Sequence, residues 1–273
     1  GTLADINNAL DGIGYMPAAN YNGPAQLDFN LNDLGNTGTG GALSSTASQL
    51  ITVLPVNDAP VLTPYGPAYN TAEGAAPITS TVATVLSSSV TDVDAAAVQG
   101  VAIYAISGTG GLLEYSINGG SSWLAVGSVS STSALLLRAN DLLRFTPDNV
   151  NGGTMLIDYR AWDQTAGTAG TKVDTSVTGG TSEFSVANDR VTVNTSSIND
   201  APTATIVPTN YSASEQTLLT LHGTGLSIAD IDAGSATIRA TITVISGTLN
   251  AGAGTTGVSI SGSGGTNITL VGT

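Results

Sequence analysis

Internal repetition is the feature that most constrains what this chain can fold into. The sequence Val-Asn-Asp-Ala-Pro at residues 56–60 recurs as Ile-Asn-Asp-Ala-Pro at residues 198–202, 142 positions later. The Asp-Val-Asp motif at residues 92–94 recurs as Asp-Ile-Asp at residues 230–232, 138 positions later. Self-similarity at a nearly constant period is the mark of repeated structural units. Each linker-like motif therefore opens a module of one common type.

A second set of matches relates the start of the chain to its middle. Tyr15-Met-Pro and Phe145-Thr-Pro lie 130 positions apart, and the alternating residues 27–31 match residues 157–161 at the same offset. Asp33 and Asp163 also keep this offset. The step from 130 to 142 predicts an insertion of about twelve residues within the Gly/Thr-rich stretch 164–185.

These offsets divide the chain into three segments. Residues 1–57 are the C-terminal half of a module, residues 58–199 form a complete module, and residues 200–273 are the N-terminal half of a third. Because half a sandwich leaves open sheet edges, we expect the last half to be completed by residues 1–57 of a neighbouring copy. The alternative is that the chain is one period of a longer array.

Strand patterns predict an all-β fold of tandem Ig-like or cadherin-like β-sandwich modules. Apolar residues alternate with polar ones over residues 25–32, 156–162 and 238–244, and no sustained helical period appears. Many short strands separated by turn residues are typical of sandwiches. The Asn-Gly-Gly run at residues 118–120 predicts a hairpin turn. A helical turn is expected over Leu3–Leu10 and over its counterpart, Arg138–Leu143.

The charge balance limits the possible partners of the chain. Its 20 acidic residues against 6 basic ones give a net charge of -14. Such a chain repels nucleic acids and anionic membrane surfaces, so cations are the expected charge partners. Cysteine is absent, so neither disulfides nor zinc thiolates stiffen the fold. No apolar run is long enough for membrane insertion.

Aspartates at fixed positions after each linker are the chemical signal. A D-x-D pair supplies two carboxylates, and the Asn-Asp of the linker adds a carboxylate and an amide oxygen. Hard cations such as Ca²⁺ take six to eight oxygen ligands of these kinds. Asp and Asn are also ordinary turn residues, so the recurrence of the set is what favours a cation site.

The chain resembles cadherin-like repeats, and its linker is typical of such repeats in large bacterial adhesins exported by type I systems. The resemblance rests on Glu73 fifteen positions after Asp58, on the D-x-D motif at residues 92–94, and on the Tyr-Arg-Ala-Trp-Asp run that ends at Asp163. It covers essentially the whole chain. Its linkers carry fewer carboxylates than those of the animal family.

The resemblance implies Ca²⁺ clusters at the two linkers. The first cluster would use Asn57, Asp58, Asp92, Asp94 and Asp163. The second would use Asn199, Asp200, Asp230 and Asp232, with Glu73 reaching down from the module above. In an assembly of copies, Asp33 of a neighbour would complete the second cluster and Glu215 of a neighbour would serve the first.

A structural role follows as the leading expectation. The chain is predicted to be a calcium-rigidified repeat of a secreted, extracellular bacterial surface adhesin, stalk or filament. One alternative is a filament subunit that joins copies head to tail through its half modules. Another is an adhesive module that binds a glycan or a protein through the long loop at residues 164–185.

Enzymatic activity is not expected from the sequence. His222 is the only histidine and has no catalytic partner motif, and the glycine-rich runs lack the Lys-Ser/Thr of a phosphate loop. The aspartate pairs could serve as glycosidase carboxylates, but their attachment to repeated linkers suits ion binding better. Trp162 could offer a sugar platform, although packing beneath the inserted loop is the favoured interpretation.

Overall fold

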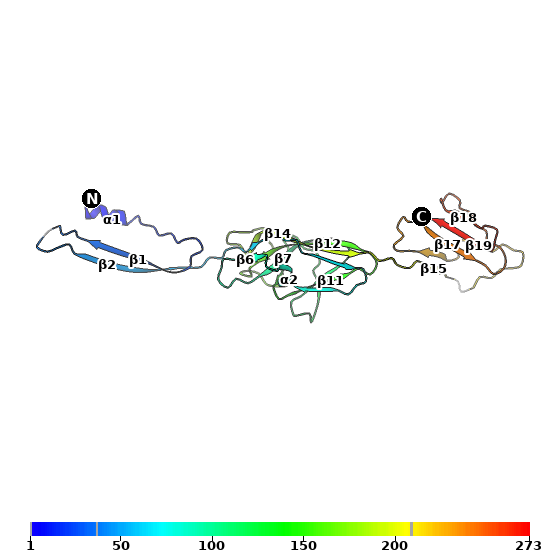
Figure 1. Ribbon diagram of the computed structural model, residues 1–273, viewed down its shortest axis with the longest axis horizontal. Coiled ribbons are helices and arrows are strands. Elements are labelled where there is room, and N and C mark those ends of the chain that lie inside the picture. The colour runs from blue at the N-terminus through cyan, green and yellow to red at the C-terminus, as the bar shows by residue number, and fades with distance from the viewer. Residues whose placement is uncertain (1, 37, 208–209) are drawn as a thin grey trace.

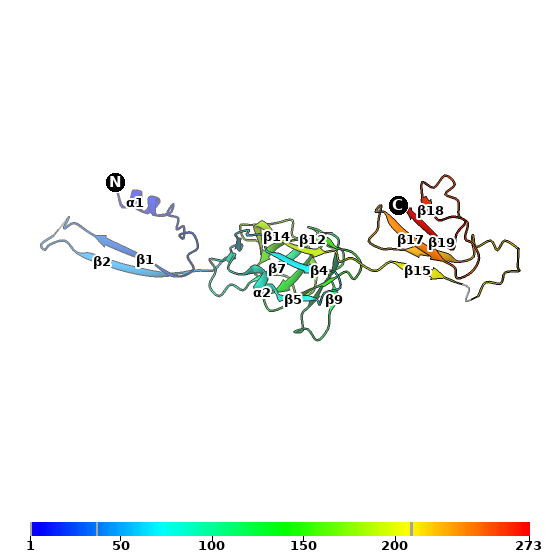
Figure 2. The same ribbon diagram turned by 45° about the vertical axis from the view of Figure 1, so that its right-hand side comes forward.

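The computed structural model describes residues 2–36, 38–207 and 210–273. Three parts follow one another along an extended molecule, with the chain ends in the first and last parts (Figures 1 and 2). Each strand pairing among these residues lies within 1–57, 58–199 or 200–273, which we call the first, middle and third parts. Among the same residues, no helix has the length and apolarity that a membrane crossing requires.

The first part contains one helix and one two-stranded sheet. Helix α1 spans Leu3–Leu10, as predicted, and Thr2 is its N-cap. The Thr2 side chain accepts a hydrogen bond from the Asp5 amide, and the Asp5 carboxylate accepts one from the Thr2 amide. Strands β1 (Gly23–Asn32) and β2 (Ser44–Val53) pair antiparallel. No residue of α1 is buried.

The middle part consists of two main sheets. The larger has the strand order β13-β10-β7-β12-β14-β4, and the smaller has the order β5-β11-β8-β9. A short β3–β6 pair and helix α2 complete it. Its elements are β3 (Val61–Leu62), β4 (Ala68–Ala72), β5 (Ile78–Thr81), α2 (Val82–Leu86), β6 (Val90–Thr91), β7 (Gly100–Gly108), β8 (Gly111–Ser116), β9 (Leu124–Ala125), β10 (Ala134–Arg138), β11 (Leu142–Pro147), β12 (Gly153–Trp162), β13 (Lys172–Val173) and β14 (Phe184–Ser196).

The core of the middle part lies between these two sheets. Ile157 and Val191 of the larger sheet belong to the same buried cluster as Leu113 and Phe145 of the smaller one. Each such side chain contributes about 1.5–3 kcal/mol through removal from water. Strands dominate throughout the described chain, so the predicted all-β class is confirmed. The Ig-like or cadherin-like subtype stays a prediction.

The long connection between β12 and β14 packs onto the larger sheet. It contributes β13, which pairs with β10, and it covers a second apolar cluster that contains Trp162 and Phe184. Trp162 is only 2% exposed, and its indole nitrogen donates to the Ala166 carbonyl at 2.7 Å. Trp162 is therefore packed beneath the loop, as favoured from the sequence, and offers no sugar platform.

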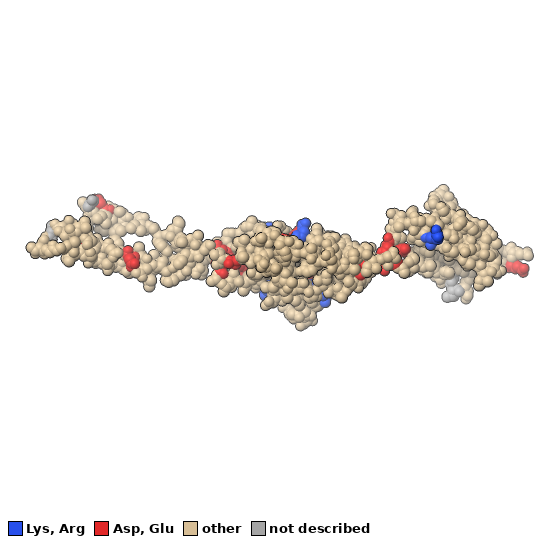
Figure 3. Space-filling view, in the orientation of Figure 1, with Lys and Arg blue, Asp and Glu red and all other residues tan. Residues whose placement is uncertain are grey.

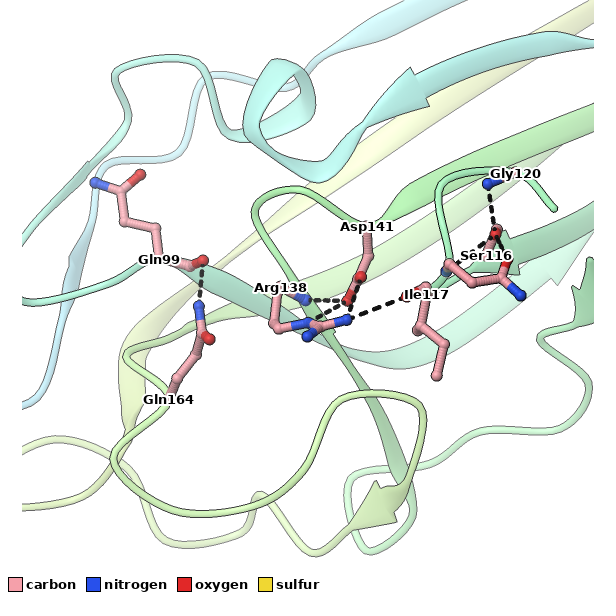
Figure 4. A network of polar contacts seen from close by, with 8 residues as sticks. Gln99, Ser116, Ile117, Gly120, Arg138, Asp141 and Gln164 are labelled. Carbon is pink, nitrogen blue, oxygen red and sulfur yellow. Dashed lines mark hydrogen bonds and ion pairs between the residues drawn. The ribbon is translucent and has the colours of Figure 1, made fainter. Parts of the chain in front are cut away.

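The turn after β10 corrects one prediction. Residues Arg138–Leu143 do not form a helical turn, because β10 ends at Arg138 and β11 begins at Leu142. The Asp141 amide donates to the Arg138 carbonyl at 3.0 Å, and the Asp141 carboxylate pairs with the guanidinium at 2.9 Å (Figure 4). Strands β10 and β11, which precede and follow these residues, are largely buried. The ion pair between Arg138 and Asp141 therefore closes a tight turn instead of a helix.

The predicted hairpin turn at residues 118–120 is confirmed, since β8 and β9 pair on either side of it. Gly119 and Gly120 both have positive φ angles, of 69° and 89°, which a glycine adopts without strain. The Ser116 hydroxyl accepts a hydrogen bond from the Gly120 amide at 2.9 Å (Figure 4).

The third part contains two small sheets. Strands β15 (Thr203–Ile206) and β16 (Leu226–Ala229) pair with each other. Strands β17 (Ile238–Thr243), β19 (Asn267–Gly272) and β18 (Ser259–Ser261) form a sheet in that order. The face of β17 predicted to point inward is poorly covered, since Ile242 is 38% exposed.

Candidate metal centres

The first junction lies where the linker after the first part meets the head of the middle part. Strand β6 ends at Thr91 and delivers Asp92 and Asp94 to an irregular loop. The Asp94 carboxylate accepts the Asp58 amide at 2.8 Å, and Asp92 Oδ1 accepts the Asp94 amide at 2.9 Å. Asp92 Oδ2 is buried and has no hydrogen-bond partner. The loop thus holds one carboxylate oxygen free for a ligand.

Asp163 joins this junction from the end of β12. Its side chain is buried, and its Oδ2 accepts a hydrogen bond from the Asn57 amide group at 2.8 Å. Its Oδ1 accepts from the amide and hydroxyl of Thr165, at 2.8 and 2.6 Å. Asn57, Asp92, Asp94 and Asp163 line one open hollow. The linker and the D-x-D loop therefore come together as predicted from the sequence.

Thr165 was not anticipated at this site. Its position two residues after Asp163 is the common spacing for a side chain that caps an aspartate in a tight loop. That spacing was the available signal, and it was indistinguishable from ordinary turn chemistry within a Gly/Thr-rich stretch.

The second junction gathers three carboxylates from three separate segments. One carboxylate oxygen from each of Glu73, Asp200 and Asp232 lies within 4.8 Å of the other two, so this group could hold a metal ion. Glu73 is in the turn after β4 of the middle part, Asp200 is in the linker, and Asp232 follows β16 of the third part. The cluster therefore spans the boundary between the two parts.

Glu73 is the most constrained member of this cluster. It is only 5% exposed, and its Oε1 accepts the Ile198 amide at 2.6 Å. Its own amide donates to the Ser196 carbonyl at 3.0 Å. Its Oε2 is buried with no hydrogen-bond partner. Burial of a carboxylate oxygen without a partner is costly, so this atom needs a cation or a donor from elsewhere.

The remaining residues of the second linker support the cluster. The Asp200 amide donates to the Asp232 carboxylate, and the Asp232 amide donates to Asp230 Oδ1 at 3.0 Å. The first junction has the same two bonds, so the loop geometry repeats with the sequence. The Asn199 side chain donates to the Asp200 carbonyl at 3.2 Å, within the linker itself.

Basic side chains form their ion pairs with carboxylates outside the two junctions. Among the described residues, the ion pairs join Arg138 with Asp141, Arg144 with Glu114, and Arg190 with Asp158. Acidic side chains are visible where the middle part meets each of its neighbours (Figure 3). An all-oxygen donor set of this kind suits hard cations such as Ca²⁺ or Mg²⁺.

Two predicted site residues stay apart from both clusters. Asp33 is exposed at the end of β1, where the amides of Leu43 and Gly35 donate to its carboxylate at 2.8 and 2.9 Å. These backbone donors hold the pKa of the Asp33 carboxyl below its usual range. Glu215 is exposed in the connection between β15 and β16. Within one copy of the chain, each junction therefore has only part of the predicted ligand set.

Comparisons with known proteins give little further guidance. No protein-family model matches the chain, and no curated protein matches it. One solved structure that is similar is an endo-fucoidan hydrolase from glycoside hydrolase family 107, at 12% identity with a TM-score of 0.28. The match covers 91% of this chain, which spans 29% of the length of that structure.

This comparison corrects the expectation that the chain is not an enzyme. The matched structure is that of a hydrolase, so the expectation is withdrawn. A TM-score of 0.28 carries no argument about the fold or activity of this chain, and no hydrolase role is assigned to any of its carboxylates.

Proposed function

We propose that this chain is a calcium-stiffened, cadherin-like structural segment of a secreted bacterial surface adhesin, stalk or filament. In this proposal, Ca²⁺ bound at the two junctions holds successive modules in line. The observation that carries the proposal is Glu73, which has a buried, unpartnered Oε2 and whose carboxylate clusters with those of Asp200 and Asp232.

The position of Glu73 explains how an ion would stiffen the second junction. Glu73 is tied to the end of β14 by its bond to the Ser196 carbonyl, so its carboxylate moves with the middle part. Asp232 follows β16 and moves with the third part. An ion shared by the two carboxylates restrains rotation about the linker, which no disulfide can do in a chain without cysteine.

The first junction supports the proposal independently. It repeats the linker-to-loop bonds of the second junction and also has a buried oxygen without a partner, Asp92 Oδ2. Asp163 adds a buried carboxylate. It accepts hydrogen bonds from the Asn57 side chain and from the amide and hydroxyl of Thr165, which are uncharged donors. Extracellular calcium modules bind with Kd values of about 10⁻⁴ to 10⁻³ M, which millimolar calcium partly to largely fills.

The magnitude of the effect is sufficient to matter. Millimolar calcium is about 1 to 10 times such a Kd, so one site stabilises the bound form by about 0.4–1.4 kcal/mol. Two such sites together contribute about 0.8–2.8 kcal/mol, which overlaps the lower part of the range of about 2–4 kcal/mol for a typical disulfide. A chain with 34 glycines and no cysteine gains directional rigidity from such sites.

Calorimetric titration with CaCl₂ tests the metal site. We expect Glu73→Gln to weaken calcium binding at the second junction by about tenfold or more, because a charged ligand becomes a neutral amide of the same shape. The matched control is Asp174→Asn, which removes an exposed carboxylate that bonds only Ser176. Equal calcium affinity in Glu73→Gln and the unsubstituted chain contradicts the proposal.

Small-angle scattering tests the stiffening itself. We expect the maximum dimension in calcium to match a nearly straight chain, and the distribution of dimensions to broaden and shorten after chelation. Glu73→Gln should resemble the chelated chain at the same calcium concentration. A scattering profile that calcium leaves unchanged rules out a stiffening role even if an ion binds.

A further inference from the structure

The long connection between β12 and β14 contacts the linker of the first junction as well as the larger sheet. We propose that its turn at residues 179–182, which we call the clamp turn, fastens this linker to the middle part without a metal ion. The inference goes beyond the proposed function, because the bonds that carry it join uncharged groups and form whether or not calcium binds.

Two linker residues are hydrogen-bonded to the clamp turn. The Ala59 amide donates to the Gly180 carbonyl at 2.8 Å. The side-chain amide of Asn57 donates to the carbonyls of Thr181 and Ser182, both at 3.4 Å. The first of these bonds has an ordinary length, whereas the two from Asn57 are longer and weaker. The bond from Ala59 is therefore the principal attachment.

The clamp turn has a fixed shape. Gly179 and Gly180 have positive φ angles of 72° and 59°, which glycine adopts without strain. The Gly179 amide donates to the Phe184 carbonyl at 2.9 Å, and the Ser182 amide donates to the Gly179 carbonyl at 3.0 Å. The buried Ser182 hydroxyl donates to the Val177 carbonyl at 2.9 Å and accepts the Phe184 amide at 3.2 Å. Phe184 begins β14 and is buried, so the turn is joined directly to the larger sheet.

The rest of the connection is anchored to the same sheet. Strand β13 pairs with β10, and the Lys172 ammonium group donates to the Ser128 carbonyl at 2.6 Å. Thr175 is buried, and its amide and hydroxyl both donate to the Ser131 carbonyl, at 2.7 and 2.9 Å. The middle part therefore holds the clamp turn from both of its ends.

The linker is short enough for the clamp turn to restrain the first part. Strand β2 ends at Val53, and only residues 54–56 separate it from Asn57. One of these is Pro55, whose ring fixes its own φ angle and restricts the residue before it. Few backbone angles therefore remain free, and fastening residues 57–59 limits the directions that the β1–β2 hairpin can take.

The clamp turn and a bound ion are separate fastenings of one linker. The bonds from Ala59 and Asn57 to the clamp turn use amide groups and backbone carbonyls, which a chelator leaves unchanged. The other linker bonds go to the carboxylates of Asp94 and Asp163, which an ion would share. Chelation should therefore loosen the first junction only in part, and loss of the clamp turn should leave its stiffness dependent on calcium.

Amide hydrogen exchange, followed by NMR on the full chain in excess chelator, tests the clamp turn. We expect the Ala59 amide to exchange at least about tenfold more slowly than in an unfolded peptide of the same sequence, because the amide is bonded to Gly180. Gly180→Val should abolish this protection, since valine is strained at a φ of 59°.

Gly119→Val is the matched control. Gly119 also lies in a turn of the middle part, at a φ of 69°, and a Cβ added at Gly119 or at Gly180 has no atom of the described chain within 4 Å. The two substitutions therefore impose similar backbone strain at different places. Gly119→Val should leave the protection of Ala59 unchanged, and urea unfolding verifies that the middle part of both variants is folded.

Residual dipolar couplings in chelator test the effect on the first part. Relative to those of β12, the couplings of β1 and β2 should fall in Gly180→Val and stay unchanged in Gly119→Val, because only the first variant frees the linker.

Three outcomes overturn the inference: an Ala59 amide that exchanges at the unfolded rate in the unsubstituted chain, protection that survives Gly180→Val, or equal loss of protection in both variants. The first of these requires no variant to fold. A protected Ala59 amide in a chain whose scattering does not respond to calcium sinks the proposed function alone. An unprotected Ala59 amide in a chain that calcium stiffens sinks this inference alone.

Discussion

The middle part and the two end parts share the same sequence repeat, yet matched side chains are buried in the middle part and exposed in the end parts. Phe145 is 4% exposed, whereas Tyr15, its counterpart 130 positions earlier, is 52% exposed. Ile157 and Leu27 differ in the same way. The strand pattern is present in all three parts, so the difference comes from whether the complementary half of the sheet is beside it.

The comparison also shows that register does not need a core. Strands β1 and β2 pair over ten residues in the register of β12 and β14, although β1 has no buried residue. Strand register is set by side-chain alternation and by the connecting loop. The opposed sheet contributes stability to a pairing that is already specified locally.

Backbone hydrogen exchange should show the largest difference between the parts. At concentrations where the chain is monomeric, amides of β12 should exchange at least about a thousandfold more slowly than those of β1, because β12 opens only with the unfolding of the middle part. Mass spectrometry of proteolytic peptides measures this ratio. Equal protection in the two strands breaks the comparison, and protection of β1 that appears with rising concentration sharpens it.

Truncation of one side chain at matched positions should give the next largest effect. Ile157→Ala removes a side chain from between the two sheets and should lower the free energy of unfolding by about 2–5 kcal/mol. Leu27→Ala at the matched position should change it by less than about 0.5 kcal/mol. Urea unfolding measures both values, with tryptophan fluorescence reporting on the middle part, which contains Trp123 and Trp162.

Circular dichroism supplies the control for this pair, since it reports on strands in all three parts. If Leu27→Ala lowers stability by several kcal/mol in a sample that sedimentation shows to be monomeric, then Leu27 is buried within one copy and the contrast between the parts is wrong.

Alkaline pH should produce a smaller difference in stability between the parts. It arises at Tyr159 in the middle part, whose counterpart in the first part is Phe29, a residue without an ionisable group. Burial, reinforced by the neighbouring Asp189, raises the pKa of Tyr159 far above its usual value, and the Tyr159 hydroxyl donates to Asp189 at 3.2 Å. Because the pKa is higher in the folded state, this stability is present below about pH 10 and is lost as pH rises and the unfolded tyrosine ionises.

Tyr159→Phe should therefore have two effects. At pH 7 the middle part should lose about 1 kcal/mol, since Asp189 loses a donor. Above about pH 10 the decline in stability should become shallower, by up to about 1.4 kcal/mol per pH unit. Urea unfolding across pH 7–11 measures both, and Tyr15→Phe in the first part should leave the profile unchanged. A Tyr159→Phe profile as steep as that of the unsubstituted chain contradicts the assignment.

Much of the fold follows from residues that act locally. Alternation over residues 25–32 and 156–162 predicted strands that the structure contains, and the Asn-Gly-Gly run predicted its hairpin. The helix at Leu3–Leu10 was also predicted, and Thr2 caps it. Its counterpart at Arg138–Leu143 was predicted wrongly, because the ion pair between Arg138 and Asp141 and the buried strands on both sides override the local preference.

The candidate site was only partly readable in advance. The repeated linkers and D-x-D motifs pointed to two junctions, and the resemblance to cadherin-like repeats assigned Glu73 to the second one. Neither the spacing nor the residue types revealed that Glu73 Oε2 and Asp92 Oδ2 would be buried without partners. That property depends on which backbone amides and carbonyls the fold brings beside each carboxylate.

The sequence by itself determined the strands and their alternating faces, because these depend on neighbours a few positions away, and its repeats identified the acidic residues that recur at each linker. Only the tertiary structure decided which apolar faces are covered and which three carboxylates come within 4.8 Å of one another. Burial and clustering arise when segments more than a hundred residues apart, such as Glu73 and Asp200, pack side by side, and local physical chemistry does not specify that contact.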